Sequence, residues 1–184
     1  MVRETAVRSV LAALVTVAVV VGFWWLRSPE ATLVKVGQQA PDLELHSLGA
    51  TAKTRLSSFR GRPVLLVMFM SSCHICDAEM PALERMHRQW LPRGLMVIGV
   101  SADTARADLE RFVQRHQITF PVLEDPGGAA LRQAYGSWRL PEAYLIDASG
   151  KVAAAWLGSV QWNSVDVRDA ITRLLPPRKP GSPY

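Results

Sequence analysis

The sequence predicts an α/β domain in which a mixed central sheet carries helices on both faces. Two apolar runs without alternation, residues 64–70 and 95–100, are typical of strands that are buried on both sides. Segments with helical periodicity follow both runs, as expected where helices connect parallel strands. Farther along, two strand-like segments separated by a short turn predict an antiparallel hairpin in the same sheet.

The composition agrees with one packed domain. The chain has 184 residues, which suits a single domain of ordinary size with appendages. Hydrophobic residues make up 49% and charged residues 20%, so the chain can build a core and does not resemble a disordered protein. The formal net charge is +5, but the basic residues are scattered. Because no basic run or nucleic-acid motif occurs, we expect no nucleic-acid partner.

The N-terminus carries a predicted membrane segment. No charged side chain occurs in residues 9–26, a length that matches the bilayer core of about 30 Å when helical. Arg3 and Arg8 before this segment favour a cytoplasmic N-terminus, and Trp24 and Trp25 would fit the outer interface. A cleaved signal peptide is the alternative, although no small-x-small cleavage site follows the apolar run. Both interpretations place the rest of the chain outside the cytoplasm.

Four segments follow from this pattern. We expect residues 1–27 to form the cytoplasmic N-terminus and the transmembrane anchor, and residues 28–36 to form a linker beginning near Pro29. Residues 37–175 would form the folded domain. The prolines after its last helix leave residues 176–184 as a flexible tail.

The first half of the domain begins with polar–apolar alternation. Residues 42–46 predict an edge strand of an N-terminal hairpin, and residues 56–63 predict a turn or a single helical turn. The buried strand at 64–70 is followed by a helix at 73–90. Its apolar face has three-to-four spacing and consists of Leu83, Met86, His87 and Trp90.

The second half repeats the strand–helix order. The strand at 95–100 precedes a helix that runs from an N-cap at Asp103 to Gln117, and Leu109, Phe112 and Val113 face inward. The remaining elements are a strand at 119–123, a turn at 125–128, a helix at 129–135, hairpin strands at 143–147 and 152–157, and a last helix at 165–175.

The two cysteines of the chain, Cys73 and Cys76, lie between a buried strand and a helix. Free backbone N–H groups and the helix dipole stabilise a thiolate there, so we expect the pKa of Cys73 below its usual value of about 8.5. Cys73 would attack a disulfide of another protein, and Cys76 would resolve the mixed disulfide. A zinc site is disfavoured because the four histidines have no ligand spacing. A purely structural disulfide would close too small a loop to stabilise the fold much.

Two neighbours of the cysteines allow two interpretations each. A protonated His74 would favour the Cys73 thiolate, and a solvent-facing residue without a role is equally consistent with the pattern. Glu79 lies about one helical turn after Cys76. It would either exchange a proton with that cysteine or be a surface charge favoured by the helix dipole.

With the pair placed, residues 37–175 resemble the TlpA/ResA-like thioredoxins, membrane-anchored thiol:disulfide oxidoreductases of the cytochrome c biogenesis type. The resemblance rests on five motifs: Gly-Gln-Gln-Ala-Pro-Asp-Leu at 37–43, the turn at 57–63, Cys-His-Ile-Cys-Asp-Ala-Glu-Met-Pro at 73–81, Thr-Phe-Pro-Val at 119–122, and Leu-Pro-Glu-Ala-Tyr-Leu-Ile-Asp at 140–147. It implies a thioredoxin-like fold.

The resemblance also implies a site. Catalytic roles fall to Cys73, Cys76, Glu79 and Pro141, where Pro141 is expected to be cis and to pack beside the redox-active disulfide. Leu140 and Pro141 would bind an extended substrate segment, and Glu79 would tune the pair.

The implied partners are proteins rather than small molecules. The expected substrate is the disulfide of a protein, with apocytochrome c or a copper-site protein as the leading classes. Electrons would come from a membrane donor of thiol–disulfide type, because no cofactor motif and no metal site occur. The catalytic domain would face the periplasm from a single-pass anchor in the cytoplasmic membrane.

Departures from the family pattern concern the residues around the cysteines. Ser72 replaces the usual Trp before the first cysteine, and Ile75 replaces a frequent Pro before the second. Two alternatives remain. One is a copper chaperone of the same fold, since thiolates bind Cu(I) well. The other is a peroxiredoxin-like thiol peroxidase, whose Pro-x-x-x-Thr-x-x-Cys pattern has Leu66 and Met70 at the proline and threonine positions.

Overall fold

The computed structural model describes residues 16, 34–137 and 139–176. The chain divides into two compact units, Met1–Thr32 and Leu33–Tyr184. The predicted anchor lies outside the described residues except for Thr16, as do most of the linker and the tail. No helix within the described part of the chain has the length and apolar character needed to cross a bilayer.

One mixed sheet of seven strands forms the centre of the second unit. Its order is β2-β1-β5-β4-β3-β6-β7. The β3, β4 and β5 strands run parallel to each other, and the other neighbours pair antiparallel. The strands are β1 (Glu44–Ser47), β2 (Lys53–Arg55), β3 (Val64–Phe69), β4 (Met96–Ser101), β5 (Val122–Glu124), β6 (Glu142–Ile146) and β7 (Val152–Leu157).

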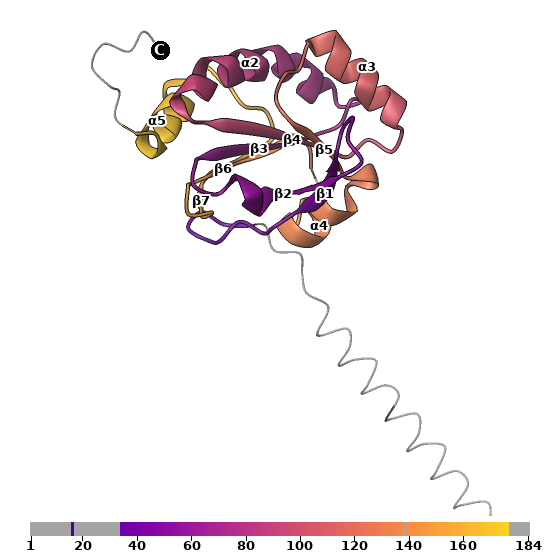
Figure 1. The fold of residues 1–184 in the computed structure, drawn as a ribbon, viewed down its shortest axis with the longest axis horizontal. Coiled ribbons are helices and arrows are strands. Elements are labelled where there is room, and N and C mark those ends of the chain that lie inside the picture. The colour runs from indigo at the N-terminus through magenta and orange to yellow at the C-terminus, as the bar shows by residue number, and fades with distance from the viewer. Residues whose placement is uncertain (1–15, 17–33, 138, 177–184) are drawn as a thin grey trace, which may run out of the picture. The chain divides into compact units, whose positions relative to one another are not determined.

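Helices lie on both faces of this sheet, as predicted. Figure 1 shows α2 and α3 on one side of the sheet and α4 on the other. The α-helices are α2 (His74–Trp90), α3 (Arg106–His116), α4 (Ala129–Tyr135) and α5 (Val165–Leu174), and short 3-10 turns occupy Leu56–Phe59, Leu91–Arg93 and Pro126–Gly128.

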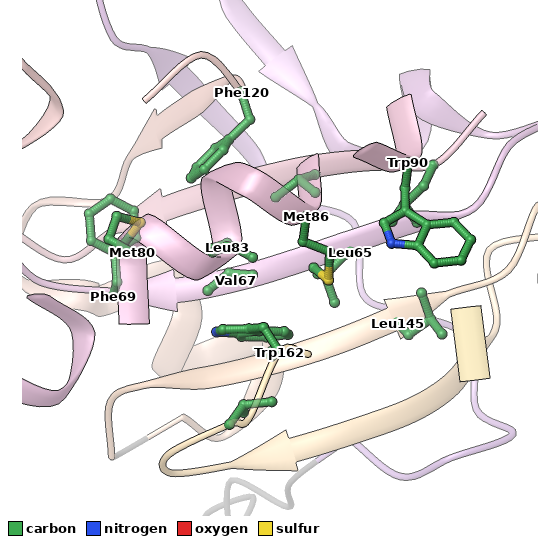
Figure 2. Close-up of a cluster of buried hydrophobic side chains, with 14 of the residues drawn as sticks. Leu65, Val67, Phe69, Met80, Leu83, Met86, Trp90, Phe120, Leu145 and Trp162 are labelled. Carbon is green, nitrogen blue, oxygen red and sulfur yellow. The ribbon is translucent and has the colours of Figure 1, made fainter. Parts of the chain in front are cut away.

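Strand β3 explains why its apolar run does not alternate. Leu65, Val67 and Phe69 face a core formed with α2, α3 and α5, which Figure 2 shows around Trp90 and Trp162. Leu66 and Met68 face a second core, built with Leu131 and Tyr135 of α4. Because side chains on a strand point to opposite faces in turn, both faces of a central strand must be apolar when both are covered.

Three expectations from the sequence were wrong in detail. Strand β1 is not an edge strand, because it lies between β2 and β5. Asp103 does not cap α3, which begins at Arg106 after Ala105. The strand predicted at 119–123 begins only at Val122, because the Thr119 N–H donates to the Glu84 carboxylate and lies outside the sheet.

The buried imidazole of His87 makes the stability of the domain sensitive to acid. The side chain packs edge-on against Phe120, and its Nδ1 is buried without a hydrogen-bond partner among the described residues. Burial lowers the pKa of His87, which the Glu84 charge opposes and the Arg88 charge reinforces. The unfolded chain therefore binds a proton at higher pH than the folded domain, and stability falls as the pH drops below about 6.5.

His87→Leu is accordingly expected to raise the free energy of unfolding by about 1 kcal/mol, because it removes a buried polar atom without a partner. It should also flatten the loss of stability as the pH falls below about 6.5. Urea unfolding at several pH values measures both effects. Met86→Leu, a volume-conserving change at a neighbouring core position, controls for repacking. An unchanged pH slope in His87→Leu would contradict this account.

Candidate active site

The two cysteines form a disulfide at the beginning of α2, but they differ in accessibility. Their Cα atoms are 5.2 Å apart. Cys73 is the N-cap residue, with extended backbone, and its sulfur accepts a hydrogen bond of 3.2 Å from the Cys76 N–H. Cys73 is half-buried, whereas Cys76 is only 1% exposed. An attacking thiolate from another protein can therefore approach the Cys73 sulfur more easily than that of Cys76.

The turn before Cys73 is tied to the neighbouring strand. The N–H and the hydroxyl of Ser71 donate to the Asp103 carboxylate, the latter over 2.6 Å. Ser101, the last residue of β4, donates to the same carboxylate over 2.7 Å. This network accounts for the missing cap of α3, because Asp103 faces the cysteine turn instead. The sequence contains only a general signal for it, since polar side chains after adjacent parallel strands converge at one sheet edge. That signal does not tell whether Asp103 caps α3 or binds the cysteine turn.

The segment before β6 reaches the cysteines from the opposite end of the sequence. The Leu140–Pro141 peptide bond is cis, as the family resemblance implied. The Cys73 sulfur lies 3.9 Å from the carbonyl oxygen of Leu140. Pro141 is buried, and its carbonyl accepts a hydrogen bond of 2.9 Å from the Gly158 N–H. The structure thus brings together Cys73, Cys76 and the Leu140–Pro141 pair.

Glu79 lies on the same helix but its carboxylate faces a different segment. It accepts hydrogen bonds from Ser159 Oγ at 2.6 Å, from the Val160 N–H at 2.7 Å and from Trp162 Nε1 at 3.2 Å. No hydrogen bond joins Glu79 to either sulfur within the described residues. The carboxylate is therefore not a freely solvated surface charge. The donors at 159–162 carry no local sequence signal, because they lie some 80 residues away in the chain.

Comparisons with known proteins place the chain in a family. A model of the AhpC/TSA family matches residues 36–155. The chain belongs to the AhpC/TSA family. Among its relatives is the thiol-disulfide oxidoreductase ResA of Geobacillus thermodenitrificans, 33% identical over 131 residues, which cover 71% of this chain and 74% of the relative. The ResA protein of Geobacillus kaustophilus is 30% identical over 166 residues, which cover 90% and 92%.

A solved structure supports the same assignment. The crystal structure of a thiol:disulfide interchange protein DsbE from Chlorobium tepidum superposes with a TM-score of 0.70 at 27% identity, over 77% of this chain and 98% of that chain. These findings confirm the thioredoxin-like α/β fold of this AhpC/TSA family member. They also show that it is a thiol-disulfide oxidoreductase of the ResA/DsbE type with a Cys-x-x-Cys pair, acting with a thiol–disulfide exchange partner.

In this family member the first turn of α2 carries a second carboxylate, bound by the last turn of α3. Asp77 accepts hydrogen bonds from His116 Nε2 at 2.9 Å and Arg115 Nη2 at 2.7 Å. The hydrogen bond from His116 holds the pKa of Asp77 below its usual value, against a smaller effect of burial, and the Arg115 and His74 charges add to the lowering. Arg115 of α3 therefore offsets a negative charge next to Cys76. The His74 side chain is exposed to solvent.

A cavity of about 320 Å³ opens beside Leu140 on the α4 side of the sheet. Met70, Ala102, Thr104 and Leu131 are among the residues that line it. In the turn that carries the disulfide, Ser72 stands where the family usually has tryptophan, and its side chain is exposed. Ile75, between the two cysteines, is 45% exposed. No group of three or more His, Cys, Asp or Glu side chains that could hold a metal ion occurs in the described parts of the chain.

Proposed function

We propose that this oxidoreductase reduces disulfides of specific extracytoplasmic proteins, with the haem-binding cysteines of apocytochrome c or the cysteines of a copper-site protein as substrates. The observation that carries this proposal is the difference in exposure between the two linked cysteines. Half-buried Cys73 caps α2 beside Leu140 and Pro141, whereas Cys76 is buried behind it. That arrangement suits an attacking thiolate and a resolving thiol.

The reaction begins with both cysteines reduced. The Cys73 thiolate attacks one sulfur of the partner's disulfide, so that a mixed disulfide forms and the other partner sulfur leaves as a thiolate. Cys76 then loses its proton and attacks the Cys73 sulfur. The Cys73–Cys76 disulfide forms, and the partner leaves with two electrons and two thiols. A dithiol donor in the membrane restores the reduced pair by the reverse exchange.

We assign three further residues to this reaction. Glu79, one turn after Cys76, would accept or supply the proton of that cysteine and tune the pair. Leu140 and Pro141 would bind an extended segment of the substrate through its backbone. The Leu140 carbonyl oxygen lies 3.9 Å from the Cys73 sulfur, which supports this assignment, since a segment bound there would lie across the reacting atom.

The proposed location rests on the N-terminal sequence. Residues 9–26 would anchor the protein as a single helix in the cytoplasmic membrane, and residues 28–36 would link the anchor to the domain at 37–175. The catalytic domain would then face the periplasm, where disulfides form and persist.

Trapping the partner tests this function. Cys76→Ser in the full chain should accumulate mixed disulfides through Cys73, because the resolving thiol is missing. Apocytochrome c or a copper-site protein among the captured proteins, and their absence with Cys73→Ser/Cys76→Ser, would support the proposal. A redox potential of the Cys73–Cys76 couple near that of strong periplasmic oxidants, about −120 mV, would contradict a reductase.

A further inference from the structure

The carboxylate of Glu79 is held by one loop, residues 159–162, which connects β7 to α5. Its Oε1 atom accepts hydrogen bonds from the Ser159 hydroxyl and the Val160 N–H, and its Oε2 atom accepts from the Trp162 indole. Both oxygens are therefore engaged. A rotation of the carboxylate would break these bonds, so the charge has one defined position on α2.

The three donors require an acceptor at that position. An indole N–H donates and never accepts, and a backbone N–H does the same. A carboxylate offers acceptors on both oxygens, whereas the amide of a glutamine would direct donor hydrogens at one of these partners. The loop is therefore matched to the carboxylate of Glu79 rather than to any polar side chain of similar size.

The indole of Trp162 is itself fixed by the core. Trp162 is 3% exposed and belongs to the same buried cluster as Met80 and Leu83 of α2. Figure 2 shows its ring within this cluster, close to Val67. Its ring also contacts Trp156 edge-on, at 6.2 Å between centroids. The indole N–H of Trp162 that donates to Glu79 is thus held in place by packed side chains. It does not have to be ordered before the cysteines react.

We propose that Trp162 and Ser159 are positioning residues for thiol chemistry: they hold the Glu79 carboxylate one helical turn from Cys76 and so set the reactivity of the cysteine pair. The negative charge of Glu79, fixed near the cysteine pair, disfavours the thiolate form of its thiols. It therefore favours the disulfide over the reduced form and makes the couple more reducing. The inference rests on the role of Glu79 in the proposed function.

The test compares single and double variants of the full chain. Two quantities are measured: the pH dependence of Cys73 alkylation in the reduced protein, and the redox potential against a glutathione buffer. Glu79→Gln should raise the alkylation rate at pH 7 about tenfold, as expected for loss of a nearby like charge. Trp162→Phe and Ser159→Ala should act in the same direction by about threefold, since each removes one of the bonds that fix the charge. The potential should become less negative in all three.

The control variant is Trp156→Phe, which removes an indole from the same aromatic pair but no hydrogen bond to Glu79. It should leave both quantities unchanged. In the Glu79→Gln background, Trp162→Phe should add nothing, because the charge that it positions is gone. Ser159 is exposed, so Ser159→Ala keeps the test valid if the tryptophan variant does not fold.

Three outcomes separate the possible failures. If Glu79→Gln changes both quantities and neither Trp162→Phe nor Ser159→Ala does, the positioning role is wrong while the proposed role of Glu79 stands. If Trp162→Phe has the same effect with and without Glu79, it does not act through that carboxylate, and the inference is overturned. If Glu79→Gln itself changes nothing, the role given to Glu79 under the proposed function fails, and this inference fails with it.

Discussion

Cys73→Ala is expected to reduce disulfide exchange to the background rate while the domain stays folded. The variant removes the half-buried sulfur at the beginning of α2, and Cys76 behind it is 1% exposed and cannot replace it. The loss of stability should be small. The sulfur accepts one capping hydrogen bond, and a cap is worth about 1 kcal/mol.

Reduction of a mixed-disulfide peptide, with a dithiol as the electron source, measures the activity, and urea unfolding measures the stability. Cys76→Ala provides the matched control, because it should still carry out the first exchange and then stop at the mixed disulfide. Multiple turnovers by the Cys73→Ala protein would show that the attacking sulfur has been assigned to the wrong residue.

The second large effect concerns stability. Phe112→Ala should lower the free energy of unfolding by about 3–5 kcal/mol, because it opens a cavity in the larger core. Phe112 is 1% exposed, and its ring stacks on that of Phe69 at a centroid distance of 5.5 Å. Its ring centroid also lies 4.5 Å from that of His116, and His116 in turn binds Asp77. The side chain therefore supports both the end of β3 and the contact between α2 and α3.

Urea unfolding at pH 7 checks this value. Val113→Ala, at the adjacent position of α3, is the control, because Val113 is only half-buried and its removal should cost about 1 kcal/mol. Equal losses in the two variants would mean that the Phe69–Phe112 stack contributes little to the core.

The central part of the fold could be predicted because its signals are local. The apolar run at β3 predicts a strand that is buried on two faces, and the bounds of α4 follow from Gly128 and Gly136 on either side of it. The cysteine spacing, together with its place before a helix, was enough to locate the redox centre and its more exposed sulfur. Each of these inferences depends on residues that are close together in the chain.

Contacts between distant segments could not be predicted in this way. An aspartate before a helix has the same appearance whether it caps the helix or binds a serine in the turn after the neighbouring strand, and Asp103 does the latter. The strand at β5 begins late because Thr119 is bound by Glu84, which is 35 residues earlier. Nothing near Trp162 indicates that its indole meets a carboxylate on α2. Hydrogen bonds of this kind depend on the packing of the elements and not on local propensity.

The Cys73 sulfur has two roles, because it also accepts the capping hydrogen bond from the Cys76 N–H. It is the atom that exchanges partners, and it is also the acceptor that closes the first turn of α2. Each time the sulfur changes between thiolate, mixed disulfide and internal disulfide, its strength as an acceptor changes, and the end of the helix is stabilised to a different degree. The stability of the first turn of α2 therefore depends on the oxidation state of the cysteine pair.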